Sequence, residues 1–181
     1  MEIAQAQRDV RTTFLGGFAG QMASSVVWFA SAFGATWVSL RVGALIAVLG
    51  GTFIYPLAVL ILRLMGRPAG LPKGHPMNAL GMQVAFVLPL TFPVVYGATL
   101  YRHAWFYPAV MIVLGAHYLP FMFSYGMKYF GVLAAVLVGA GVLLGNYVRA
   151  PAAAGAWVTA VVLLVFAFVG RWLVMAEVRT R

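Results

Sequence analysis

Six long apolar runs, each close to the length that crosses a bilayer, dominate this chain. They cover residues 13–36, 42–62, 79–100, 105–126, 129–148 and 154–176. A hydrocarbon core of about 30 Å is crossed by about 20 apolar residues in one helix. The runs are continuous and do not alternate at period two, which favours helices over a barrel. We therefore expect an all-α fold, a single domain over residues 1–181 that forms an integral membrane bundle of six transmembrane helices.

Positive charges divide unequally between the two sides of this arrangement. One side carries nine Lys and Arg residues, at positions 8, 11, 63, 67, 73, 128, 171, 179 and 181. The other side carries Arg41, Arg102 and Arg149. Because short cytoplasmic loops hold the excess of Lys and Arg, we expect both termini in the cytoplasm of a prokaryotic inner membrane. The net charge of +9 is thus interpreted as an orientation signal, and nucleic acid is not an expected partner.

Carboxylates are absent from Val10 to Ala176, since the only acids are Glu2, Asp9 and Glu177. Their absence argues against a cation pathway and against carboxylate catalysis inside the membrane. The chain also has no Cys, which excludes thiolate metal sites, and its three His residues do not form a metal-binding pattern. We expect no metal and no cofactor. Enzyme activity is disfavoured, because only a Ser–His pair is available and no G-x-S-x-G motif occurs.

Polar residues inside the apolar runs are the candidates for a substrate site or pathway. His117 stands near the middle of the run 105–126, where an ionisable side chain is costly and therefore indicates a function. Ser124 lies seven residues later on the same helical face, with Phe121 between them. Gln21 and Gln83 are further candidates. A neutral histidine that bonds to another helix is the alternative interpretation of His117.

Four prolines are expected inside helices: Pro56, Pro89, Pro93 and Pro120. Each would free the carbonyl four residues earlier, those of Thr52, Ala85, Pro89 and Ala116, and the run 79–100 with two prolines should bend. Free carbonyls at membrane depth can line a cavity and bind a ligand. Kinks that serve packing alone are the alternative.

Basic and small residues suggest two kinds of contact with partners. Arg67 and Lys73, in the loop 63–78, and Arg171 could bind an anion or a lipid headgroup, although a loop that sets topology and a side chain that reaches the surface explain them equally. Small residues recur every four positions at Gly16, Gly20 and Ser24, from Ala135 to Gly139, and from Gly141 to Gly145. Such faces let helices approach closely, inside the bundle or between copies in a homo-oligomer.

Two functions remain from these observations. The first is a channel or transporter for a neutral or anionic small molecule that uses the polar residues and kinks. The second is a non-transporting protein that binds membrane lipids or a partner subunit. A continuous polar cavity that reaches His117 would favour transport, whereas a packed interior with apolar grooves outside would favour lipid or subunit binding.

The stretch GAHYLPF, from Gly115 to Phe121, is followed by Tyr125-Gly126-Met127 and accompanied by Arg67-Pro68. This pattern resembles a motif of small bacterial multi-spanning membrane proteins of unknown function. The resemblance covers most of the chain. It implies no activity, cofactor or substrate.

Overall fold

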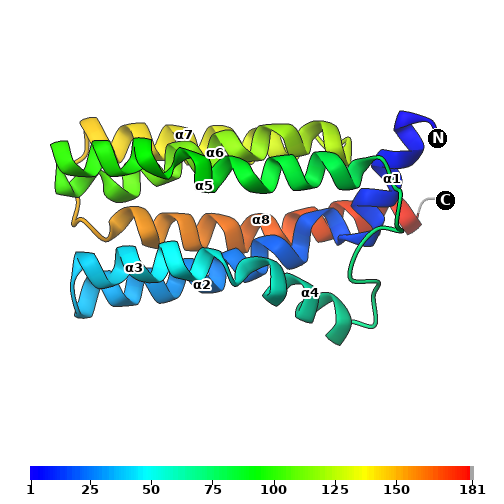
Figure 1. Cartoon of the computed structure of the whole chain (residues 1–181), viewed down its shortest axis with the longest axis horizontal. Helices are drawn as coiled ribbons and strands as arrows, with labels where there is room; N and C mark the ends of the chain where they lie inside the picture. Colours follow the sequence, from blue (N-terminus) through cyan, green and yellow to red (C-terminus); the bar gives the residue numbers. More distant parts are fainter. Residues whose placement is uncertain (180–181) are drawn as a thin grey trace.

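The computed structural model describes residues 1–179, which fold into helices without a strand among them. The α-helices are α1 (Ile3–Thr13), α2 (Phe18–Trp37), α3 (Leu40–Gly51), α4 (Ile54–Leu64), α5 (Met77–Tyr101), α6 (Phe106–Tyr125), α7 (Tyr129–Asn146) and α8 (Ala154–Arg179). Two short 3-10 segments, η1 (Leu15–Gly17) and η2 (His103–Trp105), precede α2 and α6. Figure 1 shows the long helices side by side along the long axis of the molecule. The all-α fold expected from the apolar runs is confirmed.

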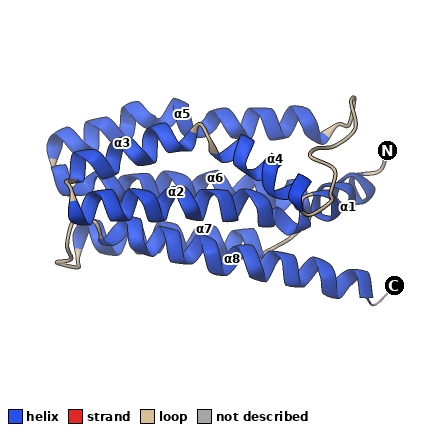
Figure 2. Ribbon diagram, turned by 90° about the horizontal axis from the view of Figure 1, so that it is seen from below, coloured by secondary structure: helices blue, strands red, loops and turns tan. Residues whose placement is uncertain are grey.

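The helices form two groups that meet along α7 and α8. In one group α6 packs against both α5 and α7, and in the other α2 packs against α3, α4 and α8. In Figure 2, α3, α4 and α5 lie along one face of the molecule and α7 and α8 along the opposite face. The main core is formed where α2, α6, α7 and α8 converge, around Tyr107, Phe130 and Leu163.

Four described helices are long and apolar enough to cross a membrane, and a fifth span results if the bent pair α3–α4 counts as one. These helices are compatible with a multi-pass membrane protein. The remaining predicted run, 13–36, corresponds largely to α2, which has 20 residues but buries four polar side chains. They are Gln21, Ser24, Ser25 and Ser31. A helix enclosed by other helices needs fewer apolar residues than one that faces lipid.

The predicted run 42–62 differs from expectation, because the structure divides it into two helices. The helix α3 ends at Gly51, α4 begins at Ile54, and the two are bent by 59°. Pro56 was expected inside a helix, but it is the third residue of α4, where a missing N–H removes no helical hydrogen bond. The break therefore lies before the proline, at a Gly-Gly pair with low helix propensity. In contrast, α5 continues as one helix through Pro89 and Pro93.

The sequence did not predict α1 or the break that separates it from α2. Leu15, Gly16 and Gly17 have φ angles of 50°, 65° and 84°, so the chain takes a left-handed turn there. Glycine adopts this region without strain, which explains the Gly-Gly pair. The turn allows α1 to pack its buried residues, Ala6 and Val10, against the end of the bundle.

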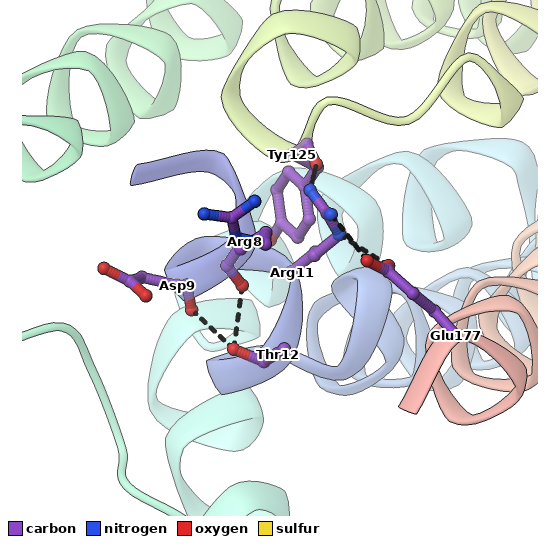
Figure 3. A network of polar contacts seen from close by, with 6 residues as sticks. All are labelled: Arg8, Asp9, Arg11, Thr12, Tyr125 and Glu177. Carbon is purple, nitrogen blue, oxygen red and sulfur yellow. Dashed lines mark hydrogen bonds and ion pairs between the residues drawn. The ribbon is translucent and has the colours of Figure 1, made fainter. Parts of the chain in front are cut away.

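Side-chain hydrogen bonds hold α1 in this position (Figure 3). Arg11 forms a two-point ion pair with Glu177 of α8, with both N–O distances at 2.8 Å. It also donates to the backbone oxygen of Tyr125, at 3.4 Å. Gln7 donates to the backbone oxygen of Phe123 at 2.7 Å. Two of these bonds satisfy the last carbonyls of α6, which have no partner within the helix.

The loop between α4 and α5 adds two contacts to the same end. Arg67 donates to the backbone oxygen of Thr12, the penultimate residue of α1, at 2.7 Å. The buried ring of His75 lies 3.5 Å from the carboxylate of Asp9. Two of the three acids in the chain, Asp9 and Glu177, therefore help to attach α1 to the rest of the protein.

Candidate functional site

A large cavity lies between the two groups of helices. Its volume is about 510 Å³, and its walls come from α2, α3, α4, α5 and α6, with Phe130 of α7. This volume falls within the range of about 300–1,000 Å³ typical of ligand pockets. Several wall residues on α4 and α5 are exposed, among them Tyr55, Ala85 and Pro89. The cavity therefore opens to the outside of the helix bundle beside α4 and α5.

The wall of the cavity is mostly apolar and carries no Lys, Arg, Asp or Glu among the described residues. Two threonines on the wall direct their hydroxyl protons to their own helices. Thr52 donates to the carbonyl of Leu49 at 2.6 Å, and Thr91 donates to that of Leu88 at 2.7 Å. The remaining polar residues gather near the α1 end, with Gln21 and Ser24 in the first two turns of α2 and His117 two turns before the end of α6.

Gln21 belongs to a hydrogen-bonded chain that begins at the left-handed turn before α2. The hydroxyl of Tyr129 donates to the carbonyl of Gly16, and the Nε2 atom of Gln21 donates to the Tyr129 oxygen at 3.2 Å. Gln21 is only 2% exposed. Its Oε1 atom is buried and has no partner within residues 1–179. Buried polar atoms nearly always have a partner, so this amide oxygen needs an explanation.

The position of Tyr129 depends on two glycines that let α8 approach the turn. A Cβ on Gly170 would lie 2.6 Å from the carbonyl oxygen of Gly16 and would collide with the Tyr129 hydroxyl. A Cβ on Gly16 would lie 2.5 Å from the carbonyl oxygen of Gly170. The missing side chains therefore leave the space in which Tyr129 reaches the Gly16 carbonyl.

His117 lies on the wall formed by α6 and is half-buried. Its ring meets the edges of Tyr118 and Phe121, with centroid distances of 5.8 Å and 5.2 Å. The ring lies close to the backbone of Val84 on α5. Its Nδ1 atom is buried and, within the described part of the chain, has no partner.

The other predicted polar candidates, Ser124 and Gln83, lie outside the cavity wall. Ser124 is buried and donates to the carbonyl of Pro120 in its own helix at 3.0 Å. Gln83 is exposed on α5. Of the predicted stripe on α6, His117 and Phe121 line the cavity and Ser124 does not.

The prolines and basic candidates are also dispersed. Pro89 lines the cavity, whereas Pro56 and Pro93 are exposed and Pro120 is half-buried away from it. Arg67 is engaged with the end of α1, and Lys73 is exposed in the loop. Arg171 is half-buried, and its guanidinium lies over the ring of Phe18 at 5.1 Å. The structure therefore does not bring these three cations together at the cavity.

Tyr129 and the aromatic wall are the site residues that sequence reasoning missed. Tyr125 ends α6 and Tyr129 begins α7, and at helix ends aromatic residues are common in membrane proteins, so position alone did not single them out. In the structure Tyr125 lines the cavity together with Tyr118, and the hydroxyl oxygen of Tyr129 accepts a hydrogen bond from Gln21. The Gly-Gly pair at 16–17 could have predicted a break in the helix. A break leaves a backbone carbonyl without a helical partner, and here Tyr129 donates to that carbonyl of Gly16.

Comparison with known proteins gives a family but no activity. A model for a family of unknown function (DUF7010) matches residues 3–176, and the chain belongs to this family. No curated protein and no solved structure matches the chain at a significant level. The expected relation to an uncharacterised family is confirmed, while the particular motif from Gly115 to Phe121 stays a prediction.

Proposed function

Starting from membership of a family without an assigned function, we propose that this protein binds a lipid-like amphipathic molecule in the cavity between its helix groups. The ligand has a long apolar body and a small uncharged polar group. It enters sideways from the bilayer, through the opening between α4 and α5. The ligand belongs to the membrane phase, because the opening and most of the wall are apolar.

The observation that carries this proposal is a pair of buried polar atoms that have no partner within residues 1–179, Oε1 of Gln21 and Nδ1 of His117. Both residues belong to the wall of the same uncharged cavity. A buried polar atom without a hydrogen bond costs about 1–3 kcal/mol. A ligand that hydrogen-bonds to both atoms would recover this free energy, while its apolar body gains from contact with the wall.

The proposal includes the topology expected from the sequence. We take α2, the bent pair α3–α4 and the helices α5 to α8 as six spans in a prokaryotic inner membrane. The nine-to-three division of Lys and Arg supports cytoplasmic termini. The length of α2, 20 residues, and its position among the other long helices support its assignment as a span.

Transport of a neutral or anionic small molecule is the other function that the sequence favours. A conducting path for such a solute would need polar residues across the membrane. The cavity wall is polar mainly near the α1 end and is apolar toward the other end. The geometry therefore supports the binding of an apolar body better than the passage of a small polar solute.

On α7 the small-residue pattern leaves one part, from Ala135 to Gly139, for the contact proposed between copies in a homo-oligomer. Cβ atoms on Gly141 and Gly145 would meet the backbone oxygen and the side chain of Pro108 at 2.8 Å and 3.3 Å. This part of the face is therefore occupied by α6 of the same chain. Only Gly139 has nothing within 4 Å of the added Cβ.

Fluorescence quenching of Trp28 tests the proposal, because this residue lies on the cavity wall and is only 6% exposed. We would replace the other four tryptophans, Trp37, Trp105, Trp157 and Trp172, with Phe and place the protein in lipid nanodiscs. Added 9,10-dibromooctadecan-1-ol is expected to quench Trp28 with a saturable dependence on its mole fraction. Bromine quenches only at short range, so saturation would indicate occupancy of the cavity.

Two matched variants on α5 complete the test. Ala85→Phe fills the rim of the cavity, and Ala98→Phe makes the same change outside the wall. We expect Ala85→Phe to raise the mole fraction of probe needed for half-saturation about tenfold, because the larger side chain fills space that the chain of the probe would occupy. Quenching that rises linearly and equally in both variants would contradict the proposal, since Trp28 would then sense bulk lipid only.

A further inference from the structure

The direction of each hydrogen bond around Gln21 can be assigned from the partners alone. The carbonyl of Gly16 can only accept, so the hydroxyl proton of Tyr129 must go to it. The Tyr129 oxygen then accepts the bond from Gln21, which fixes the amide NH₂ of Gln21 as the donor. The atom of Gln21 that remains without a partner is therefore the carbonyl oxygen Oε1, which only accepts.

His117 lies on the same wall, and its Nδ1 atom is buried without a partner among the described residues. A neutral imidazole has one N–H and one lone pair, so Nδ1 can offer a ligand either a donor or an acceptor.

The threonines on the wall extend this pattern. Thr52 and Thr91 use their protons within their own helices, so only their lone pairs face other groups. The wall also carries hydroxyl groups that can donate or accept, and none of its hydrogen-bonding groups is a Lys, Arg, Asp or Glu; the hydroxyl groups belong to Ser24, Tyr55, Tyr118 and Tyr125.

From these contacts we infer that the ligand is recognised through a hydroxyl on a long-chain molecule, which donates its one proton to Oε1 of Gln21 and accepts a hydrogen bond at its oxygen from Nδ1–H of a neutral His117. The inference rests on the proposed function and names the chemical class of its ligand. An ester or ether of the same chain offers no donor, so Oε1 of Gln21 would stay unpaired. A carboxylate would face this acceptor and no cation of the wall, and an ammonium would meet no carboxylate there.

Four probes with the same dibrominated chain test the inference on the Trp28-only protein. They are 9,10-dibromooctadecan-1-ol, its methyl ether, 9,10-dibromooctadecanoate and 9,10-dibromooctadecylamine. We expect the alcohol to reach half-saturation at a mole fraction at least about tenfold lower than the methyl ether, because the ether has no proton to donate to the buried Oε1 atom of Gln21. The two charged probes should require still higher mole fractions.

A pair of glutamine variants assigns the selectivity to the site. Gln21→Leu removes one acceptor and should reduce the alcohol-to-ether ratio about tenfold, while Gln83→Leu makes the same change on the exposed face of α5 and should leave the ratio unaltered. The comparison of probes in the unmodified site remains decisive if Gln21→Leu fails to fold.

The outcomes separate this inference from the proposed function. Equal, saturable quenching by alcohol and ether would overturn the donor selectivity and leave lipid binding in place. Tighter binding of the carboxylate or the amine would overturn it too. Absence of saturable quenching by all four probes would refute the proposed function itself.

Discussion

The crossing of α8 over the turn before α2 makes Gly170 a sensitive position. A Cβ added there would collide with the Tyr129 hydroxyl and lie 2.9 Å from Cζ of the same ring. It would also lie 2.6 Å from the carbonyl oxygen of Gly16. Neither neighbour is the end of a flexible chain. We therefore expect Gly170→Ala to push the ring away and break the hydrogen bond from Tyr129 to Gly16.

The expected size of the effect follows from three contributions. Overfilling a packed site destabilises by about 1–3 kcal/mol. Loss of the hydrogen bond to the buried Gly16 carbonyl adds about 1 kcal/mol. Replacement of glycine by alanine inside a helix offsets this by about 1 kcal/mol. The sum predicts that Gly170→Ala lowers the free energy of unfolding by about 1–3 kcal/mol.

Unfolding of the purified protein in detergent measures this effect, with Gly139→Ala as the matched control. A Cβ on Gly139 meets nothing within 4 Å, so only the helix propensity changes, and the variant should be as stable as the parent or more stable by up to about 1 kcal/mol. If Gly170→Ala and Gly139→Ala unfold alike, the close crossing of α8 and the turn is refuted.

Three further predictions address the ends of the bundle and the site. Replacing Arg11 or Glu177 by Gln should each destabilise the protein, and the double variant should show a coupling of about 1 kcal/mol in a double-mutant cycle; zero coupling would argue against the ion pair. Because the chain has no Cys, single substitutions report topology without background: a membrane-impermeant maleimide should label Arg149→Cys in intact cells but Lys73→Cys only after permeabilisation, and the reverse pattern would invert the orientation. His117→Phe removes an unpaired buried nitrogen, so its stability in an unfolding assay should match or exceed that of the parent, while the dibrominated alcohol should bind about tenfold more weakly; unchanged binding would exclude His117 from the site.

Much of the fold follows from length and hydropathy, and the exceptions have a common physical cause. Five of the six predicted runs correspond to described helices or to the bent pair α3–α4 that pass the criterion for a membrane span. The structure also has breaks near Gly16 and Gly51 that the runs conceal. Apolar composition is the same on both sides of a break, and glycine fits a close helix contact as well as a left-handed turn. Whether a glycine forms a turn or a helix contact depends on the segment that packs against it. For Gly16 that segment contains Gly170, which is far away in the sequence.

The candidate site was predictable where the cost of burial singles out a residue. Gln21 and His117 were identified because an amide or imidazole inside an apolar run requires a partner, and both line the cavity. The same rule also selected Ser124, which bonds within its own helix, and Gln83, which faces outward. This rule did not identify Tyr129, because the residue to which Tyr129 donates, Gly16, lies 113 residues away in the sequence.

The placement of acids connects the fold with the chemistry of the cavity. Asp9 and Glu177 contact His75 and Arg11 at the end where α1 docks, so these carboxylates contribute to attachment of the helix. The polar side chains on the cavity wall are neutral, and Gln21 and His117 can hold a hydroxyl without burying any charge. Gln21→Glu would end this neutrality by placing an unpaired carboxylate on the wall. An ionised glutamate there should raise the affinity for the dibrominated amine relative to the alcohol, and a site that owes its selectivity to shape alone would not show that reversal.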